Sequence, residues 1–160
     1  MTDIDHKHLK TILRHIDNVR NSCLLLGERL IDQGEESLGL NLIANGHIHD
    51  HSKFYGIEWD LLRDELKESK PEQFLIALAH HQKTNRHHPE AWEDCVRGMP
   101  TVYIAEMVCD WKARSNEFAT GLRDWVKVKA TKRWGFTLQS KEYKTIKRFM
   151  DLLLDSEFKS

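Results

Sequence analysis

A histidine and an aspartate stand side by side near the end of a predicted helix, and this pair is the most distinctive candidate for chemistry. His49 and Asp50 lie in the segment 46–54, which reads GHIHDHSKF. Adjacent side chains on a helix point about 100° apart, so both reach one ion only if it lies between them at the helix end. Imidazole nitrogen and carboxylate oxygen together suit a divalent transition metal such as Mn, Fe, Co or Zn. The pair therefore predicts part of a metal site.

Further ligands must come from elsewhere in the chain, and two candidates stand out. His15 lies at the edge of an apolar helix face, between Ile12 and Val19, so it faces the core boundary. Taken alone, a histidine in such a position is usually a structural residue whose hydrogen bonds are satisfied within the fold. Asp110 lies inside an apolar helical segment, where a dry, unpaired carboxylate costs several kcal/mol. Arg114, four residues later, offers a plain ion pair instead, and both interpretations stay open.

Four of the ten histidines crowd into residues 80–88, namely His80, His81, His87 and His88. Imidazole at this density indicates metal or proton chemistry, and a surface loop with incidental histidines is the alternative. Asn85 and Arg86 lie between the histidines and are candidates for contacts with phosphate or a base, although polar loop residues are often merely solvated.

The order of these residues resembles the H…HD…D signature of HD-domain metal-dependent phosphohydrolases. The resemblance implies four ligands for one metal ion: His15, His49, Asp50 and Asp110. Shorter motifs are also similar to an uncharacterised family of small phage and bacterial proteins, namely HIDNV at 15–19, HDHSKF at 49–54, HHxxxNxHHPExW at 80–92 and EMxxDW at 106–111. This second likeness names no substrate.

Lys53 departs from the nucleotidase branch of the superfamily, which has a glutamate three residues after the HD aspartate. It resembles instead the HDxxK of cyclic-dinucleotide phosphodiesterases and of the di-iron oxygenase branch. Both branches add histidines before the last aspartate, which makes His80 and His87 candidate ligands of a second metal ion. Those branches, however, separate their extra histidines more widely.

The resemblance implies a phosphohydrolase that acts on a nucleotide or related small phosphate ester through a metal-activated water, with one or two ions. Lys53 would offset charge on the phosphoryl group. His81 or His88 would protonate the leaving oxygen, because free imidazole has a pKa of about 6.5. The alternatives are a di-iron oxygenase, or a non-catalytic protein that binds metal, nucleotide or nucleic acid.

The elements expected to position these residues are all helices. Apolar residues recur at steps of three and four through the first 30 residues, which predicts a helix over about 3–33 that ends at Gly34. Ser69 and Glu72 have the spacing of a capping box for a helix that Pro71 begins and His88-Pro89 ends. Further helices are expected over 36–50, 57–66, 101 to about 132 and 143–154. With no strand pattern, the sequence predicts one all-α domain over residues 1–160, a bundle of about six to seven helices.

Composition excludes several classes of protein. The longest apolar run spans residues 23–26, far below the roughly 20 residues of a membrane-spanning helix. The N-terminus has no basic start followed by an apolar run, as a secretory signal requires. Three cysteines without a C-x-x-C pair argue against a disulfide framework. The sequence therefore predicts a cytoplasmic protein without a membrane partner.

Charge is uneven along the chain. Residues 1–111 contain 12 Lys and Arg against 19 Asp and Glu, whereas residues 112–148 contain 11 against 3. The basic part from about residue 123 can attract a phosphorylated ligand or nucleic acid, although a solvated helix face is the preferred interpretation. The helical tryptophans are expected to pack in the core or at its rim rather than to stack on bases: Trp92, Trp111, Trp125 and Trp134.

Overall fold

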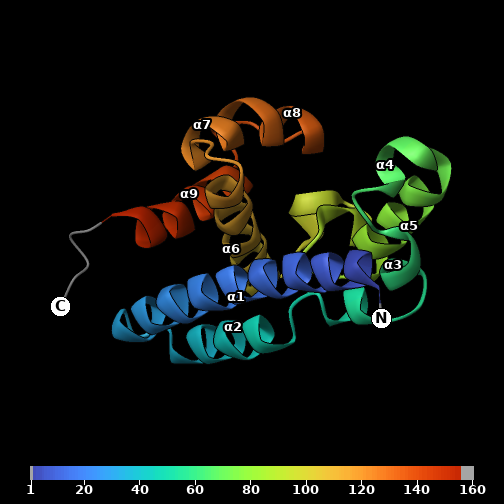
Figure 1. Cartoon of the computed structure of the whole chain (residues 1–160). Coiled ribbons are helices and arrows are strands. Elements are labelled where there is room, and N and C mark those ends of the chain that lie inside the picture. Colours follow the sequence, from blue (N-terminus) through green and yellow to red (C-terminus); the bar gives the residue numbers. More distant parts are fainter. Residues whose placement is uncertain (1, 156–160) are drawn as a thin grey trace.

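Helices alone build the part of the chain that the computed structural model describes, residues 2–155 (Figure 1). The long helix α1 (Asp3–Asp32) packs along α2 (Glu36–Ile48), which returns beside it after a short turn. Helix α6 (Thr101–Glu117) crosses α1, and α9 (Lys141–Leu154) packs on both. The predicted all-α class is confirmed.

Helix α1 begins where a capping box satisfies its first free N–H groups. The side chain of Thr2 accepts from the backbone N–H of Asp5, and the side chain of Asp5 accepts from that of Thr2. The apolar stripe found in the sequence is buried against the rest of the molecule: Ile12, Ile16, Val19, Cys23, Leu26 and Leu30. The chain turns away at Gly34, whose φ of +85° favours glycine. The predicted helix is confirmed.

Glycines allow α1 and α2 to approach very closely. A Cβ atom on Gly27 would lie 2.5 Å from Cγ1 of Ile43, and one on Gly39 would collide with the carbonyl oxygen of Gly27. A Cβ atom on Gly46 would lie 2.6 Å from that of Cys23. Gly46 comes three residues before His49, so this close contact also fixes the end of α2 against α1.

Three more helices follow along the chain: α3 (Gly56–Leu61), α4 (Leu66–Ser69) and α5 (Pro71–Thr84). Helix α5 begins at Pro71 as predicted, but the predicted cap is wrong. Ser69 belongs to α4 and donates to the carbonyl of Glu65, because an extra turn of helix precedes Lys70. Helix α5 ends at Thr84, earlier than expected, so His87 and His88 lie in the following loop.

The C-terminal part forms a broken helical arm before the last helix. After α6, the chain forms α7 (Leu122–Trp125), the π-helical turn η4 (Val126–Ala130) and α8 (Thr131–Trp134). Ser140 then caps α9, whose apolar face is buried and includes Ile146, Phe149 and Met150. Across residues 2–155, no helix combines the length and apolarity needed to cross a membrane.

The glycine contact between α1 and α2 yields a stability prediction. Gly39→Ala should lower the free energy of unfolding by about 1–3 kcal/mol, because its methyl group must displace the backbone of α1. Gly98→Ala is the matched control, since its Cβ would lie 3.5 Å from the nearest side chain. Urea titration followed by circular dichroism measures both. Equal stabilities of the two variants would contradict the close approach.

Candidate metal centre

Buried polar atoms without hydrogen-bond partners gather at one point in the molecule. Five of the seven such side-chain atoms in the described chain belong to this cluster: Nε2 of His15, His49 and His87, and Oδ1 of Asp50 and Asp110. They come from α1, the end of α2, the loop after α5, and α6. Nitrogen and oxygen donors facing one another in this way are the arrangement that a divalent cation would satisfy.

The backbone at the end of α2 explains how two adjacent residues reach the same point. The last helical residue is Ile48, and His49 leaves the helix with a ψ of 131°. Asp50 then takes the left-handed conformation with a φ of 55°, which aspartate tolerates better than most residues. The two side chains therefore turn toward one side of the helix end, as the sequence required.

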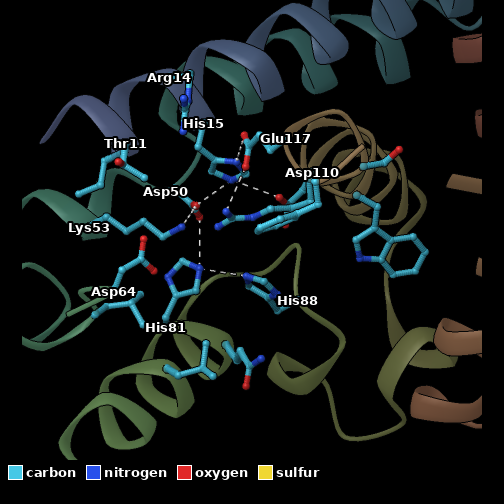
Figure 2. Close-up of a pocket in the computed structure, with 18 of the residues that line it drawn as sticks. Thr11, Arg14, His15, Asp50, Lys53, Asp64, His81, His88, Asp110 and Glu117 are labelled. Carbon is cyan, nitrogen blue, oxygen red and sulfur yellow. Dashed lines mark hydrogen bonds and ion pairs between the residues drawn. The ribbon is translucent and has the colours of Figure 1, made fainter. Parts of the chain in front are cut away.

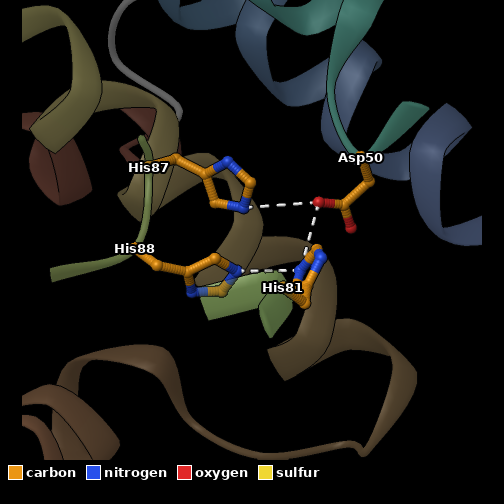
Figure 3. Close-up of side chains that lie close together, drawn as sticks. All are labelled: Asp50, His81, His87 and His88. Atoms are coloured by element: carbon orange, nitrogen blue, oxygen red, sulfur yellow. Dashed lines mark hydrogen bonds and ion pairs between the residues drawn. The ribbon is translucent and has the colours of Figure 1, made fainter. Parts of the chain in front are cut away.

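Asp50 lies between two sets of donors. Its Oδ2 is 3.5 Å from Nε2 of both His15 and His49. Its Oδ1 is 3.4 Å from Nε2 of both His81 and His87, as Figure 3 shows. Two ligands that are each about 2.1 Å from one ion lie roughly 3.0–3.4 Å apart, so both sets have the spacing of ligands to a common ion.

The remaining donors complete the two sets. Asp110 Oδ1 lies 3.2 Å from Nε2 of His15, which adds it to the first set. His88 Nε2 lies 3.0 Å from Nε2 of His81, which adds it to the second (Figure 3). We call His15, His49, Asp50 and Asp110 the first donor set, in which His15, His49 and Asp50 lie close to one another and Asp110 joins through His15. The second donor set is Asp50, His81, His87 and His88, and Asp110 also groups with His49 and His87.

Three glutamates behind the histidines hold the rings with Nε2 facing inward. Nδ1 of His15 lies 3.0 Å from Glu117, and Nδ1 of His81 lies 2.7 Å from Glu58. Glu106 lies beneath two rings, with its Oε1 2.9 Å from Nδ1 of His49 and 3.3 Å from that of His87. A carboxylate on the second ring nitrogen fixes the tautomer and orientation of a metal-binding histidine.

Sequence reasoning assigned no role to these glutamates. Glu106 did carry a signal, because it lies one helical turn before Asp110 in the same apolar segment, and glutamate is rarely buried unless paired. Glu58 and Glu117 lie in ordinary helical sequence, so only the fold reveals their partners.

Charges in the cluster are strongly coupled. Burial opposes a positive charge on His15, but the three carboxylates around it outweigh this and raise its pKa to about 10. Burial likewise opposes ionisation of Asp50 and Asp110, yet the neighbouring cationic groups hold both pKa values well below the usual range. Without a metal ion, a proton on His15 therefore balances the buried carboxylates.

Two predicted residues of the site occupy unexpected positions. His80 belongs to neither donor set, because its side chain is 46% exposed and its Nδ1 contacts the outer oxygen of Glu58. Its neighbour His81 occupies the inward position instead. Lys53 is buried, and its Nζ lies 2.5 Å from Oδ2 of Asp50, directly beside the first donor set.

The two predicted substrate contacts lie away from the cluster's open side. The Asn85 amide donates to Ser52 and to the carbonyl of His81, which braces the histidine loop. The Arg86 guanidinium lies over the rings of Trp92 and Tyr103, 5.0 and 4.8 Å from their centroids. Neither Asn85 nor Arg86 lines the pocket that opens onto the donor atoms.

A pocket with a volume of about 950 Å³ opens onto the donor atoms (Figure 2). Its floor contains five of the donor residues, namely His15, Asp50, His81, His88 and Asp110. Lys53 lines it, together with four further cations: Arg14, Lys67, Arg114 and Arg133. Arg133 belongs to the basic part of the chain that was expected to attract a phosphorylated ligand, whereas sequence reasoning gave Arg14 and Lys67 no role. The cluster is thus accessible to a ligand of substantial size.

Metal removal should destabilise the protein. A ligand at 100 times its Kd adds about 2.7 kcal/mol of stability, and loss of this amount lowers Tm by roughly 5–10 °C in a chain of this size. Differential scanning calorimetry with and without a chelator measures the change. Asp50→Ala, which removes the carboxylate shared by both donor sets, should bind no metal and show no chelator-dependent shift. An equal shift in that variant would contradict the site.

The glutamate beneath two histidines should control metal affinity without touching the ion. Glu106→Gln should weaken metal binding about 10- to 100-fold, because the amide no longer fixes both rings as a carboxylate does. The exposed Glu28→Gln on α1 is the control and should bind metal normally. Calorimetric titration with Mn²⁺ or Zn²⁺ gives both affinities. Unchanged affinity in Glu106→Gln would exclude this supporting role.

Comparison with known proteins places the chain in a family without assigning it a function. No curated protein matches the sequence, and no solved structure matches it either. A family model described as a family of unknown function, DUF5662, matches residues 4–155, which is nearly the whole chain. The chain therefore belongs to the family of unknown function DUF5662.

Proposed function

We propose that the protein is a metal-dependent phosphohydrolase that cleaves a small phosphate ester. The observation that carries the proposal is the convergence of unpartnered histidine and aspartate atoms at the floor of a cation-lined pocket. The order of these residues along the chain, which resembles the H…HD…D signature, supports the same conclusion.

The donor atoms favour a particular class of metal. Imidazole nitrogens and carboxylate oxygens suit Mn, Fe, Co or Zn, and the two donor sets on either side of Asp50 support two ions. When bound, such ions polarise a phosphoryl oxygen and lower the pKa of a coordinated water toward neutrality. We assign His81 and His88 to the second ion rather than to proton donation, because their Nε2 atoms face each other beside Asp50.

The cations around the pocket define the charge of the substrate. The side chain of Arg14 is exposed at the pocket and makes no ion pair or hydrogen bond within residues 2–155. Arg114 reaches Glu117, next to the first donor set, with an N–O distance of 3.1 Å. Arginine presents several donors to a phosphate group at once, so these residues suit an anionic ester. Lys53 is the cation nearest the donor atoms and is proposed to meet the phosphoryl group.

The cysteines bear on where this activity would occur. Cys23, Cys95 and Cys109 are free thiols, which is typical of proteins in a reducing compartment such as the cytoplasm.

Elemental analysis followed by a phosphate-release screen tests the proposal. The purified full chain, loaded in turn with Mn²⁺, Fe²⁺, Co²⁺ or Zn²⁺, is given nucleotides, cyclic dinucleotides and sugar phosphates. We expect bound metal and phosphate release that chelation abolishes. Bound metal without turnover of any ester would overturn the hydrolase and leave a metal-binding protein.

A di-iron oxygenase is the second candidate, because three histidines and a shared carboxylate form the second donor set. It predicts a coloured, redox-active iron centre and consumption of dioxygen with an organic substrate. Oxygen-electrode measurements on the iron-loaded protein separate it from the hydrolase.

Lys53 should be required for turnover more than for metal binding. A protonated lysine has no lone pair for a metal ion, so Lys53→Met should retain the metal content of the native protein. Loss of one preorganised charge should lower kcat/KM for phosphate release by about 100-fold. Lys83→Met, on the exposed side of α5, is the control and should remain fully active. Loss of metal from Lys53→Met would instead indicate that the lysine only supports Asp50.

A further inference from the structure

One side of the pocket is lined by aromatic side chains that the proposed reaction does not use. We call Phe118, Trp125 and Trp134 the aromatic wall. Trp111 also borders the pocket, but it is only 8% exposed and belongs to the hydrophobic core. The tryptophans of the wall are half-buried, so they lie at the rim of the core, where the sequence placed them, and also face the pocket.

The rings of the wall are held in a fixed arrangement. Trp134 stacks on Trp111 with centroids 5.2 Å apart and planes inclined by 14°. Trp125 meets both rings edge-on, at interplanar angles of 65°. Aromatic rings packed this way resist rearrangement, so the two tryptophans of the wall form a preformed surface.

Phe118 is the least buried part of the wall. Its side chain is 68% exposed, although it lines a pocket whose floor holds the donor sets. A large apolar side chain left open to solvent in a pocket that tryptophans also line is typical of a ligand-binding surface. The core therefore does not account for the position of Phe118.

Both ends of the wall are tied to the candidate metal centre. Glu117, the residue before Phe118, accepts from Nδ1 of His15 at 3.0 Å. Glu90, two residues after His88, accepts from Nε1 of Trp134 at 3.1 Å and from Arg133 at 2.9 Å. These hydrogen bonds connect the two ends of the wall to segments that carry donor residues. Because the wall and five donor residues line the same pocket, a single molecule can contact both.

We infer that the substrate is a phosphate ester whose organic part carries a planar aromatic ring, and that this ring stacks on the aromatic wall. The inference rests on the proposed function. Metal ions and pocket cations satisfy the phosphoryl group, but a volume of about 950 Å³ leaves room for a much larger organic part. Aromatic side chains bind planar rings such as nucleobases through their faces, whereas a bare sugar offers no such surface.

The test compares esters that differ only in the ring. AMP and GMP carry a purine, and ribose 5-phosphate has the same sugar and phosphoryl group without it. With the metal-loaded full chain, we expect a KM at least tenfold lower for the purine nucleotides. The measured quantity is the KM for ribose 5-phosphate divided by the KM for AMP. Phe118→Ala should reduce this ratio by about tenfold, the effect of removing one stacking surface. Its exposed position makes misfolding of this variant a minor concern.

Matched variants distinguish the loss of an aromatic ring from damage to the fold. Val128→Ala, which is 62% exposed on the same arm but does not line the pocket, should leave the ratio unchanged. Trp125→Leu should reduce the ratio, and Trp125→Phe should largely restore it, because phenylalanine keeps an aromatic face. Equal KM values for AMP and ribose 5-phosphate in the native protein would overturn the inference and leave the hydrolase standing.

Binding without turnover separates this inference from the proposed function. Adenosine has the ring but no phosphoryl group, so its quenching of tryptophan fluorescence, excited beyond the absorption of adenine, reports binding of the ring without the phosphoryl contacts. Because the chain has five tryptophans, the comparison with Phe118→Ala assigns the signal to the wall. We expect saturable quenching in the native protein and at least tenfold weaker quenching in Phe118→Ala. Quenching without phosphate release from any ester would uphold the aromatic wall and overturn the hydrolase. Absence of quenching by both adenosine and AMP would show that the aromatic wall does not bind the ring and would overturn the inference.

Discussion

The burial of one carboxylate, that of Asp50, is the constraint on which the rest of the structure depends. A charged carboxylate in the interior is costly unless cations and hydrogen bonds surround it. Here its two oxygens face different partners, with histidines from α1 and α2 on one side and from α5 and the following loop on the other. Four separate segments must therefore dock together before the cost of burying Asp50 is offset.

The glutamates extend this dependence outward into the fold. Because Glu106 contacts His49 and His87, it couples the end of α2 to the histidine loop through α6. Burial opposes ionisation of Glu106, yet these two histidines lower its pKa to about 2. In each such chain a glutamate contacts a histidine, and the histidine contacts Asp50 or Asp110. These contacts join the helices into one cooperative unit, because loss of one residue leaves the charge of its neighbour uncompensated.

Features that depend on residues close together in the sequence could be predicted, whereas features that depend on tertiary packing could not. Periodicity sufficed for α1, and the order of His15, His49, Asp50 and Asp110 sufficed to group residues that the fold does bring together. The sequence does not distinguish His80 from His81 as the residue that faces the donor sets, because one residue turns a helix by about 100° and only tertiary packing selects the inward face. The aromatic wall was equally inaccessible to sequence reasoning, since the breaks after Glu117 and around the π-helical turn decide where its rings point.

The glycine-mediated contact of α1 with α2 has a consequence for the order of assembly. The two helices adjoin in sequence, and structures rich in local contacts form fastest. His15, His49 and Asp50 all lie within this hairpin, so most of the first donor set comes together while α6 and the histidine loop are still undocked. An ion captured at that stage would act as a template on which the later segments close, making metal supply during synthesis a determinant of folding yield.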